Sequence, residues 1–484
     1  MKGVNKISKK KFKGDGIFFT GMNSCDVTGS EVLIKFQGKQ LLLECGLYQS
    51  NSFLESYKIN SQRFKFDPSE VDYCFINHCH IDHVGRLCKL VKDGFKGKII
   101  TTSQTATLVL PLLLNSAFIL DSEARMLSKK YKREYLPLYS EDDVYRTMDF
   151  IYEYDEFNEN YELDDVVSFK WLHNSHCVGA TQLQLQLSGK TNHSSILYTS
   201  DIGGLKSNNN YTENTEINDE FKKIVLMEST YGEKSRVNKK TREKDVEHLR
   251  VAINTVFERG GRVLIPAFSF SRTQQLLTTL YELYHNDMEF NYDIVVDSKL
   301  SCEITELYSK ILKGDDLKLW NKVMSWKNLR LIKEKDESVS CIKDKESKVV
   351  ISSSGFCTNG RVLGYLQEYL KNKDDMVIFS GYVGSDESYL SYRIKNFDTN
   401  KTININKKPI KNEADCISLS SFSSHANRDD LIEFASSQNC ERIYLVHGSE
   451  QAKIDLQKGI QEALHKKNKS FKVLISSKDM ICRL

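Results

Sequence analysis

The chain has 484 residues, of which 40% are hydrophobic and 27% charged, and its formal net charge is +3. These values are typical of a folded protein of two or three domains and exclude a disordered chain. The longest apolar run, Leu108 to Leu120, contains Pro111 and is too short to cross a bilayer, so we predict no membrane segment. Twelve scattered cysteines and a basic N-terminus without a following apolar segment favour a reducing, cytoplasmic location.

The first half of the chain is predicted to be rich in β-strands. Residues 104–150 have mostly helical periodicity, and the acidic tract 141–165 is expected to be a solvated helix and connection. Strand-like apolar or alternating runs cover residues 16–20, 32–36, 41–45, 71–77, 97–102, 166–173, 181–187, 195–199 and 224–227.

After residue 231 strands and helices alternate. Strands are predicted at 262–268, 292–297, 348–353 and 376–380, and helices at 245–260, 272–284, 302–312 and 361–371. Alternation of this kind predicts a mostly parallel, helix-covered sheet. We therefore predict an α/β protein in which a domain at 232–407 is inserted between the two parts of a first domain, 1–231 and 408–484.

Four side chains that can bind metals lie within six positions, directly after the predicted strand 71–77. They are His78, His80, Asp82 and His83. Three imidazoles and a carboxylate placed together carry a high desolvation cost unless a cation lies among them. The pattern therefore predicts a metal site at the end of a strand.

Three further candidate ligands each follow a strand-like run. They are His176, Asp201 and His447. A single histidine is more often a hydrogen-bonded structural residue than a ligand, but the cluster at 78–83 favours the ligand interpretation here. Two divalent metals held close together need about eight ligand positions, including one bridging carboxylate.

These residues, in this order, resemble the metallo-β-lactamase superfamily. The motifs at 228–232 (Glu-Ser-Thr-Tyr-Gly), 424–426 (Ser-His-Ala) and 447–448 (His-Gly) further resemble its β-CASP branch of nucleic-acid nucleases. The form of the first motif is similar to that of the cleavage-and-polyadenylation endonuclease and its prokaryotic homologues. The resemblance runs from about residue 16 to residue 450 and implies an αββα sandwich with an inserted β-CASP domain.

The resemblance also implies a site with two Zn²⁺ ions. His78, His80 and His176 would bind one ion. Asp82, His83 and His447 would bind the other, with Asp201 and a hydroxide bridging the pair. The hydroxide would attack the phosphorus. His425 would then protonate the leaving oxygen, oriented by Glu228.

His447 in the last motif resembles the RNA-directed members more than the DNA-repair members, so we expect a single-stranded RNA substrate in a cleft between the domains. Candidate substrate contacts are Arg272, Ser354, Arg361, Tyr382, Arg393 and Ser424. The serines could equally cap helices and turns. A DNA nuclease and a non-catalytic scaffold subunit stay open as alternatives, as do internal or 5′-end cutting and a homodimer or processing complex.

Four positions depart from the pattern of the family. Glu44 stands where Asp is usual, Ser271 where Gly is usual, Lys299 where Pro is common, and Ser449 where Glu is usual. None of the four removes a predicted metal ligand, so the departures bear on the substrate more than on the chemistry.

Overall fold

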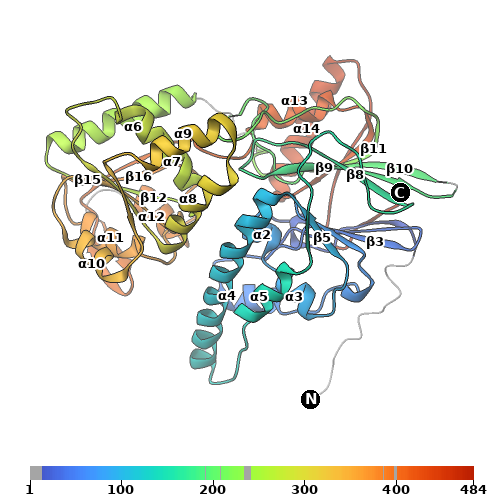
Figure 1. Cartoon of the computed structure of the whole chain (residues 1–484), viewed down its shortest axis with the longest axis horizontal. Coiled ribbons are helices and arrows are strands. Elements are labelled where there is room, and N and C mark those ends of the chain that lie inside the picture. Colours follow the sequence, from blue (N-terminus) through green and yellow to red (C-terminus); the bar gives the residue numbers. More distant parts are fainter. Residues whose placement is uncertain (1–13, 191, 208, 234–240, 385, 397–400) are drawn as a thin grey trace.

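The computed structural model describes residues 14–190, 192–207, 209–233, 241–384, 386–396 and 401–484, and Figure 1 shows them as two lobes. The blue, green and red parts of the chain form one lobe, and the yellow-green to orange part forms the other. The basic N-terminal segment before residue 14 lies outside the described residues. The chain leaves the first lobe and later returns to it, which confirms the predicted insertion.

The first lobe contains two seven-stranded sheets. One has the order β22-β1-β2-β3-β4-β5-β6. Its strands are β1 (Gly16–Phe18), β2 (Val32–Phe36), β3 (Lys39–Leu43), β4 (Tyr73–Phe75), β5 (Lys98–Thr101), β6 (Ile151–Glu153) and β22 (Ile481–Cys482). Because β22 pairs with β1, the two parts of the first domain share one sheet.

The second sheet has the order β21-β20-β11-β10-β9-β8-β7. Its strands are β7 (Tyr161–Glu162), β8 (Val167–His173), β9 (Thr181–Ser188), β10 (His193–Tyr198), β11 (Lys222–Glu228), β20 (Cys440–Val446) and β21 (Lys472–Ile475). The strands β10, β11, β20 and β21 are parallel neighbours, so their C-terminal ends meet at one edge.

The two sheets pack face to face around an apolar core. Alternate residues of β9, among them Leu183 and Leu185, point into this core, where they meet Phe75, Phe169 and Trp171. This agrees with the alternation in the sequence, since successive strand residues face opposite sides. The predicted connection at 141–165 contains β6 and β7 in addition to a helix, so it contributes an edge strand to each sheet.

Helices cover the outer faces of the sandwich. They are α1 (Phe53–Asn60), α2 (Ile81–Val84), α3 (Leu87–Lys92), α4 (Ser103–Tyr131) and α5 (Glu141–Met148) on one side, and α13 (Arg428–Ser437) and α14 (Glu450–Lys466) on the other (Figure 1). Two short 3₁₀ turns complete the lobe, at Met22–Ser24 and Pro68–Glu70. The predicted αββα arrangement is therefore confirmed.

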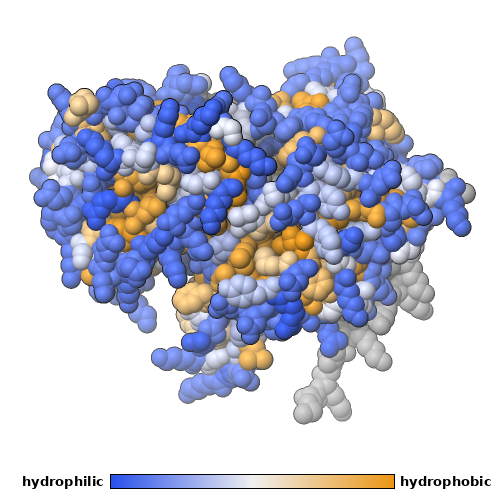
Figure 2. Space-filling view, viewed as in Figure 1, coloured by the Kyte–Doolittle hydropathy of each residue, from blue (hydrophilic) through white to orange (hydrophobic). Residues whose placement is uncertain are grey.

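Helix α4 is one continuous helix of 29 residues that includes Pro111. By length and composition alone it could cross a membrane, and half of its most apolar window is buried within the fold. Figure 2 shows apolar side chains gathered near the middle of the molecule, around the upper part of this helix. A core helix of a soluble domain has the same properties, so this helix is weak evidence for a membrane segment.

The inserted domain is built on a six-stranded sheet with the order β14-β13-β15-β12-β16-β19, in which every neighbouring pair is parallel. Its strands are β12 (Val263–Pro266), β13 (Asp293–Asp297), β14 (Leu329–Ile332), β15 (Lys348–Ser352), β16 (Met376–Phe379) and β19 (Asp415–Ser418). A separate hairpin joins β17 (Thr402–Ile405) to β18 (Lys408–Lys411).

The helices of this domain are α6 (Arg242–Glu258), α7 (Arg272–Tyr284), α8 (Lys299–Ile311), α9 (Gly314–Met324), α10 (Lys335–Lys343), α11 (Val362–Tyr369) and α12 (Leu390–Asn396). The parallel, helix-covered sheet matches the prediction. The predicted boundary at 407 is too early, however. Strand β19 pairs with β16 of the inserted sheet, so the chain returns to the first domain only after Ser418.

Candidate metal centre

The cluster of ligands lies where the chain leaves β4 and enters α2. His80 is the residue before the helix, and Asp82 and His83 lie on its single turn, while His78 lies on the loop before them. Gly46 permits the close packing of this turn, because a Cβ at that position would lie 1.6 Å from the carbonyl oxygen of Asp82. The short helix therefore places consecutive ligands on one side of the site.

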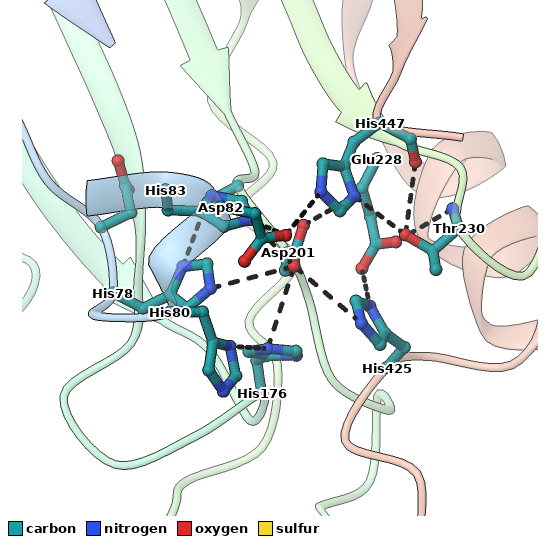
Figure 3. Close-up of polar contacts among 12 residues, drawn as sticks. His78, His80, Asp82, His83, His176, Asp201, Glu228, Thr230, His425 and His447 are labelled. Carbon is teal, nitrogen blue, oxygen red and sulfur yellow. Dashed lines mark hydrogen bonds and ion pairs between the residues drawn. The ribbon is translucent and has the colours of Figure 1, made fainter. Parts of the chain in front are cut away.

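The remaining candidate ligands follow strands of the second sheet. His176 comes after β8, Asp201 after β10 and His447 after β20. The register places Glu228 of β11 opposite Val446, so Glu228 lies beside His447. Figure 3 shows these side chains turned toward the cluster, with Asp201 at the centre. The structure thus brings together all seven residues that the sequence predicts as ligands.

Three imidazoles form the first group. His78, His80 and His176 each offer a ring nitrogen, and these atoms lie within 4.8 Å of one another. The ring centroids are 4.9, 5.0 and 5.1 Å apart, so the three rings form a nearly equilateral triangle. Three imidazole nitrogens with an open fourth position are typical of a catalytic zinc site.

Two carboxylates and two imidazoles form the second group. Asp82, His83, Asp201 and His447 place ligand atoms within 4.8 Å of one another. The Oδ2 atom of Asp82 lies 3.5 Å from Nε2 of His83 and 3.5 Å from Nε2 of His447. Mixed oxygen and nitrogen ligands also suit a divalent metal.

Asp201 lies between the two groups. Its Oδ2 atom is 3.2 Å from Nε2 of His83, 3.8 Å from Nε2 of His78 and 3.9 Å from Nε2 of His176. One carboxylate therefore reaches ligands of both groups, as a bridging ligand must.

The polar atoms of the site fit a metal better than they fit one another. The Nε2 atoms of His78, His83 and His447 are buried and make no hydrogen bond with any residue that the structure describes. Buried polar atoms without a partner are rare in folded proteins because their desolvation is not compensated. Cations among these atoms would supply the missing interaction.

The first group of ligands has the protonation state that suits metal binding. Burial lowers the pKa of His80 to about 4 and holds the pKa values of His78 and His176 well below their usual range. These imidazoles are therefore neutral near pH 7, the form that binds metals. Burial alone would raise the pKa of Asp201, but His447 and His83 hold it well below the usual range.

Glu44 supports the ligands from behind. Its carboxylate accepts hydrogen bonds of 2.5 Å from Nδ1 of His83, from the hydroxyl of Tyr198 and from the hydroxyl of Ser200. Ser200 in turn lies 3.2 Å from Nδ1 of His78. Hydrogen bonds to the second nitrogen of a metal-binding histidine fix its tautomer and orientation. Glu44 therefore orients one ligand of each group.

The backbone around the site is strained at three positions. Glu44, Ser200 and His447 have φ values of 61°, 52° and 49°, in the left-handed region that residues other than glycine rarely adopt. Such conformations cost about 1–3 kcal/mol each and cluster at functional sites. His447 is a proposed ligand, and Glu44 and Ser200 orient other ligands, so the strain coincides with the site.

His425 and Glu228 form a pair on the side of the site facing the inserted domain. Nδ1 of His425 lies 3.2 Å from Oε1 of Glu228, and Nε2 lies 3.9 Å from Oδ2 of Asp201. Burial alone would lower the pKa of His425, but the carboxylates of Glu228 and Asp201 raise it to about 10. The imidazole is therefore protonated near pH 7 and can donate a proton from Nε2.

The predicted substrate contacts have different surroundings. Nη1 of Arg361 donates 2.7 Å and 3.0 Å hydrogen bonds to Asp297 and the carbonyl of Ile332, and the Ser354 hydroxyl accepts a 3.0 Å bond from the amide of Thr358. Both residues therefore have structural roles within the inserted domain, which compete with the predicted substrate contact.

The other four predicted contacts are Arg272, Arg393, Tyr382 and Ser424. Nη1 of Arg272 donates to the carbonyl of Ser380, while its Nε is buried and makes no hydrogen bond with a described residue. Nε of Arg393 is also buried and makes no hydrogen bond with a described residue. Tyr382 is 40% exposed, and Ser424 is partly buried beside His425. These four stay candidates for substrate binding.

Two of the residues that depart from the family pattern have local explanations. Ser449 is the N-cap of α14, where its hydroxyl accepts a 3.1 Å hydrogen bond from the amide of Ala452. Lys299 is the first residue of α8, a position that also suits proline. Ser271 instead has φ 65°, so its backbone adopts a conformation that glycine would adopt at less cost.

Sequence reasoning missed the residues that orient the ligands. Tyr198 and Ser200 contact Glu44, and Thr230 places its Oγ1 atom 3.0 Å from Nδ1 of His447. Ser200 and Thr230 lie near predicted functional residues in the sequence, and this proximity was the only indication of their role that the sequence offered. Their contacts depend on the packing of the two sheets.

Comparison with known proteins covers both domains. Residues 273–387 match the family model described as the Beta-Casp domain, and residues 410–472 match the Zn-dependent metallo-hydrolase RNA specificity domain. The chain belongs to the β-CASP family of metallo-β-lactamase-fold enzymes. Residues 14–237, which form the first part of the sandwich, match the model of the anti-Pycsar protein Apyc1.

Several β-CASP relatives have names that describe an activity. The chain is 27% identical to ribonuclease TTHA0252 of Thermus thermophilus, covering 90% of this chain and 93% of that protein. It is 28% identical to an RNase J-like protein of Methanocaldococcus jannaschii, covering 86% and 89%. Endoribonuclease YSH1 of Kluyveromyces lactis is 25% identical over 89% of this chain, which spans only 55% of YSH1.

A crystal structure of a protein of unknown function from Enterococcus faecalis has the same overall fold. It matches this chain with a TM-score of 0.53 at 12% identity, covering 97% of this chain and 100% of that one. This likeness supports the two-domain β-CASP architecture and carries no information on activity.

Proposed function

We propose that this protein is a zinc-dependent ribonuclease that hydrolyses phosphodiester bonds of single-stranded RNA at the boundary between its two domains. The observation that carries the proposal is the meeting of seven metal-binding side chains with a protonated His425 at one edge of the sandwich. The relatives named as ribonucleases and the match to an RNA specificity domain support RNA as the substrate.

The two groups of ligands would hold two Zn²⁺ ions. The first ion would be held by His78, His80 and His176, and the second by Asp82, His83 and His447, with Asp201 shared between them. Zinc bound there would lower the pKa of water and offset the negative charge of the phosphate. The buried Nε2 atoms on both sides of Asp201 make no hydrogen bond with a described residue, which supports two ions more than one.

His425 would act as the general acid. Its Nδ1–H donates to Glu228, which leaves the protonated Nε2 directed toward the side of Asp201 where the scissile phosphate would bind. Glu228 is itself fixed, because its Oε1 accepts a 2.7 Å bond from the amide of Ile202 and its Oε2 a 3.1 Å bond from the amide of Thr230. A proton from Nε2 would then neutralise the leaving oxygen.

Contacts between the inserted domain and the metal centre support substrate binding at the boundary. The ring centroid of Phe270 in the inserted domain lies 5.3 Å from that of His80. Arg272 supplies a guanidinium beside this boundary, where it would contact a phosphate. The twelve cysteines are all free, which agrees with our proposal of a reducing, cytoplasmic compartment.

The test compares cleavage of matched single-stranded RNA and DNA oligonucleotides by the zinc-loaded protein. We expect RNA cleavage, loss of cleavage and of bound zinc in Asp82→Ala, and loss of cleavage with zinc retained in His425→Ala. Preference for DNA would favour the alternative nuclease. Bound zinc well below two ions per chain, with no cleavage of either substrate, would favour a non-catalytic scaffold. RNAs with a labelled 5′ end would separate internal from 5′-end cutting.

A further inference from the structure

Four aromatic side chains lie together on loops of the inserted domain. We call Phe268, Phe356, Tyr382 and Tyr389 the aromatic platform. Phe356 is at its middle, with ring centroids 5.2 Å from Phe268, 6.2 Å from Tyr382 and 5.4 Å from Tyr389. The first two contacts are edge-to-face, an arrangement that holds the rings in defined orientations.

The loops that carry these rings contain glycines at the points of contact. A Cβ on Gly355 would lie 3.2 Å from two ring atoms of Phe268, and a Cβ on Gly384 would lie 2.3 Å from the ring of Tyr389. Gly384 also has φ 99°, which side-chain-bearing residues rarely adopt. The backbone therefore lies directly against the rings of Phe268 and Tyr389.

The platform exposes apolar surface that the fold does not use. Phe268 is 45% exposed and Tyr382 is 40% exposed. Burying a large apolar side chain stabilises a protein, so part of this stabilisation remains available to a bound molecule. Exposed aromatic surface of this kind is typical of a binding site.

The position of the platform connects it to the proposed active site. Phe268 belongs to the same loop as Phe270, whose ring packs against the metal ligand His80. At the other end, Ser388, next to Tyr389, accepts a 2.6 Å hydrogen bond from Asn51 of the first domain. The platform therefore lies along the boundary that leads to the metal centre.

The charge beside the platform suits a nucleic acid. Nη1 of Arg272 donates to the carbonyl of Ser380 and lies 2.6 Å from the place of a Cβ on Gly381, the residue before Tyr382. A guanidinium beside exposed aromatic faces matches a strand whose phosphates contact the cation while its bases stack on the rings.

We infer that the aromatic platform stacks unpaired bases of the RNA strand next to the scissile phosphate, so that this enzyme selects single-stranded RNA with little preference for base identity. The inference rests on the proposed function. Only unpaired bases can present both faces to side chains, since a duplex buries them. Stacking on aromatic rings is tolerant of sequence because every base has a π-face.

The test measures the KM for a single-stranded RNA in Phe356→Ala and Phe356→Leu. We expect KM to rise about fivefold to 150-fold in both variants, the range for one lost base stack. Hydrolysis of bis(4-nitrophenyl) phosphate, which needs the metal centre but has no RNA base, should keep its kcat. Phe356→Trp should restore the KM. Phe118→Ala is the matched control, because Phe118 is an aromatic residue 74% exposed on α4, away from the platform.

An abasic scan of the RNA separates stacking from a general structural effect. In the unsubstituted protein, removing one particular base should raise KM as much as Phe356→Ala does, and in Phe356→Ala the same removal should have no further effect. An unchanged KM in Phe356→Ala, additive losses at every abasic position, or equally tight binding of a duplex would overturn the inference. If the unsubstituted protein does not cleave RNA, the proposed function fails. RNA affinity measured by fluorescence anisotropy in the unsubstituted protein and in Phe356→Ala still tests whether the platform binds RNA.

Discussion

Glu44 offers the sharpest test of how the metal centre is organised. In Glu44→Gln the side chain keeps its length and volume but loses its charge and one acceptor oxygen. In the unsubstituted protein the carboxylate accepts three short hydrogen bonds, from His83, Tyr198 and Ser200. An amide has one oxygen and a donating nitrogen, so at least one of these three donors would face another donor.

The expected loss follows from these contacts. A hydrogen bond to a charged group contributes about 1.5–3 kcal/mol, which corresponds to roughly 10-fold to 100-fold in an equilibrium constant. Losing the bond to His83 should weaken zinc binding in the second group by that factor, the range found for residues that orient ligands. The zinc affinity of Glu44→Asp should lie between those of the unsubstituted protein and Glu44→Gln, because the shorter side chain cannot reach all three donors together.

The assay is zinc competition against a chelator of known affinity, with zinc per chain measured at each concentration. Glu31→Gln is the matched control: Glu31 is also a buried carboxylate, but it pairs with Arg86 and contacts none of the predicted ligands. We expect Glu31→Gln to bind two ions with unchanged affinity. If Glu44→Gln also binds two ions as tightly as the unsubstituted protein, the orienting role of Glu44 is refuted.

Three further predictions use other parts of the structure. Glu228→Gln removes a charge that raises the pKa of His425, so the alkaline limb of the pH–rate profile should move from near pH 10 to lower pH by about 1–3 units; an unmoved limb would exclude His425 as the acid. Arg361→Ala leaves buried Asp297 without its cationic partner and should lower the free energy of unfolding in urea by about 3–5 kcal/mol without reducing the salt dependence of RNA binding. Ser271→Gly relieves a left-handed backbone and should raise stability by about 1 kcal/mol, where a loss would contradict the strain.

The resemblance to the metallo-β-lactamase superfamily predicted that the cluster after β4 meets the candidate ligands that follow strands of the other sheet. Within the second sheet the strand pattern was sufficient, because each candidate follows a strand and parallel strands bring their C-terminal ends to one edge. The inserted parallel sheet was predictable for the same reason. The segment 313–343 was not, since α9, β14 and α10 carry many charged residues and short apolar runs.

The substrate side was harder to predict because its contacts join distant segments. Arg361 pairs with Asp297, which lies 64 positions earlier, and nothing near Arg361 in the sequence indicates that its charge is already compensated. The end of the inserted domain was misplaced because β19 has only four residues and joins its sheet by pairing with β16. Pairing partners of short strands depend on the whole fold.

The metal centre and the acid depend on different parts of the chain. The first group of ligands lies within the first 176 residues, whereas His447 and His425 come from the part that follows the inserted domain. The amide of Ser421, near His425, donates a 2.8 Å hydrogen bond to buried Asp245 of α6, which links it directly to that domain. Displacement of the inserted domain would therefore disturb the acid and the platform, and it would also remove Phe270 from the ring of His80 in the first group. Substrate entry and proton transfer are thus coupled through one interface.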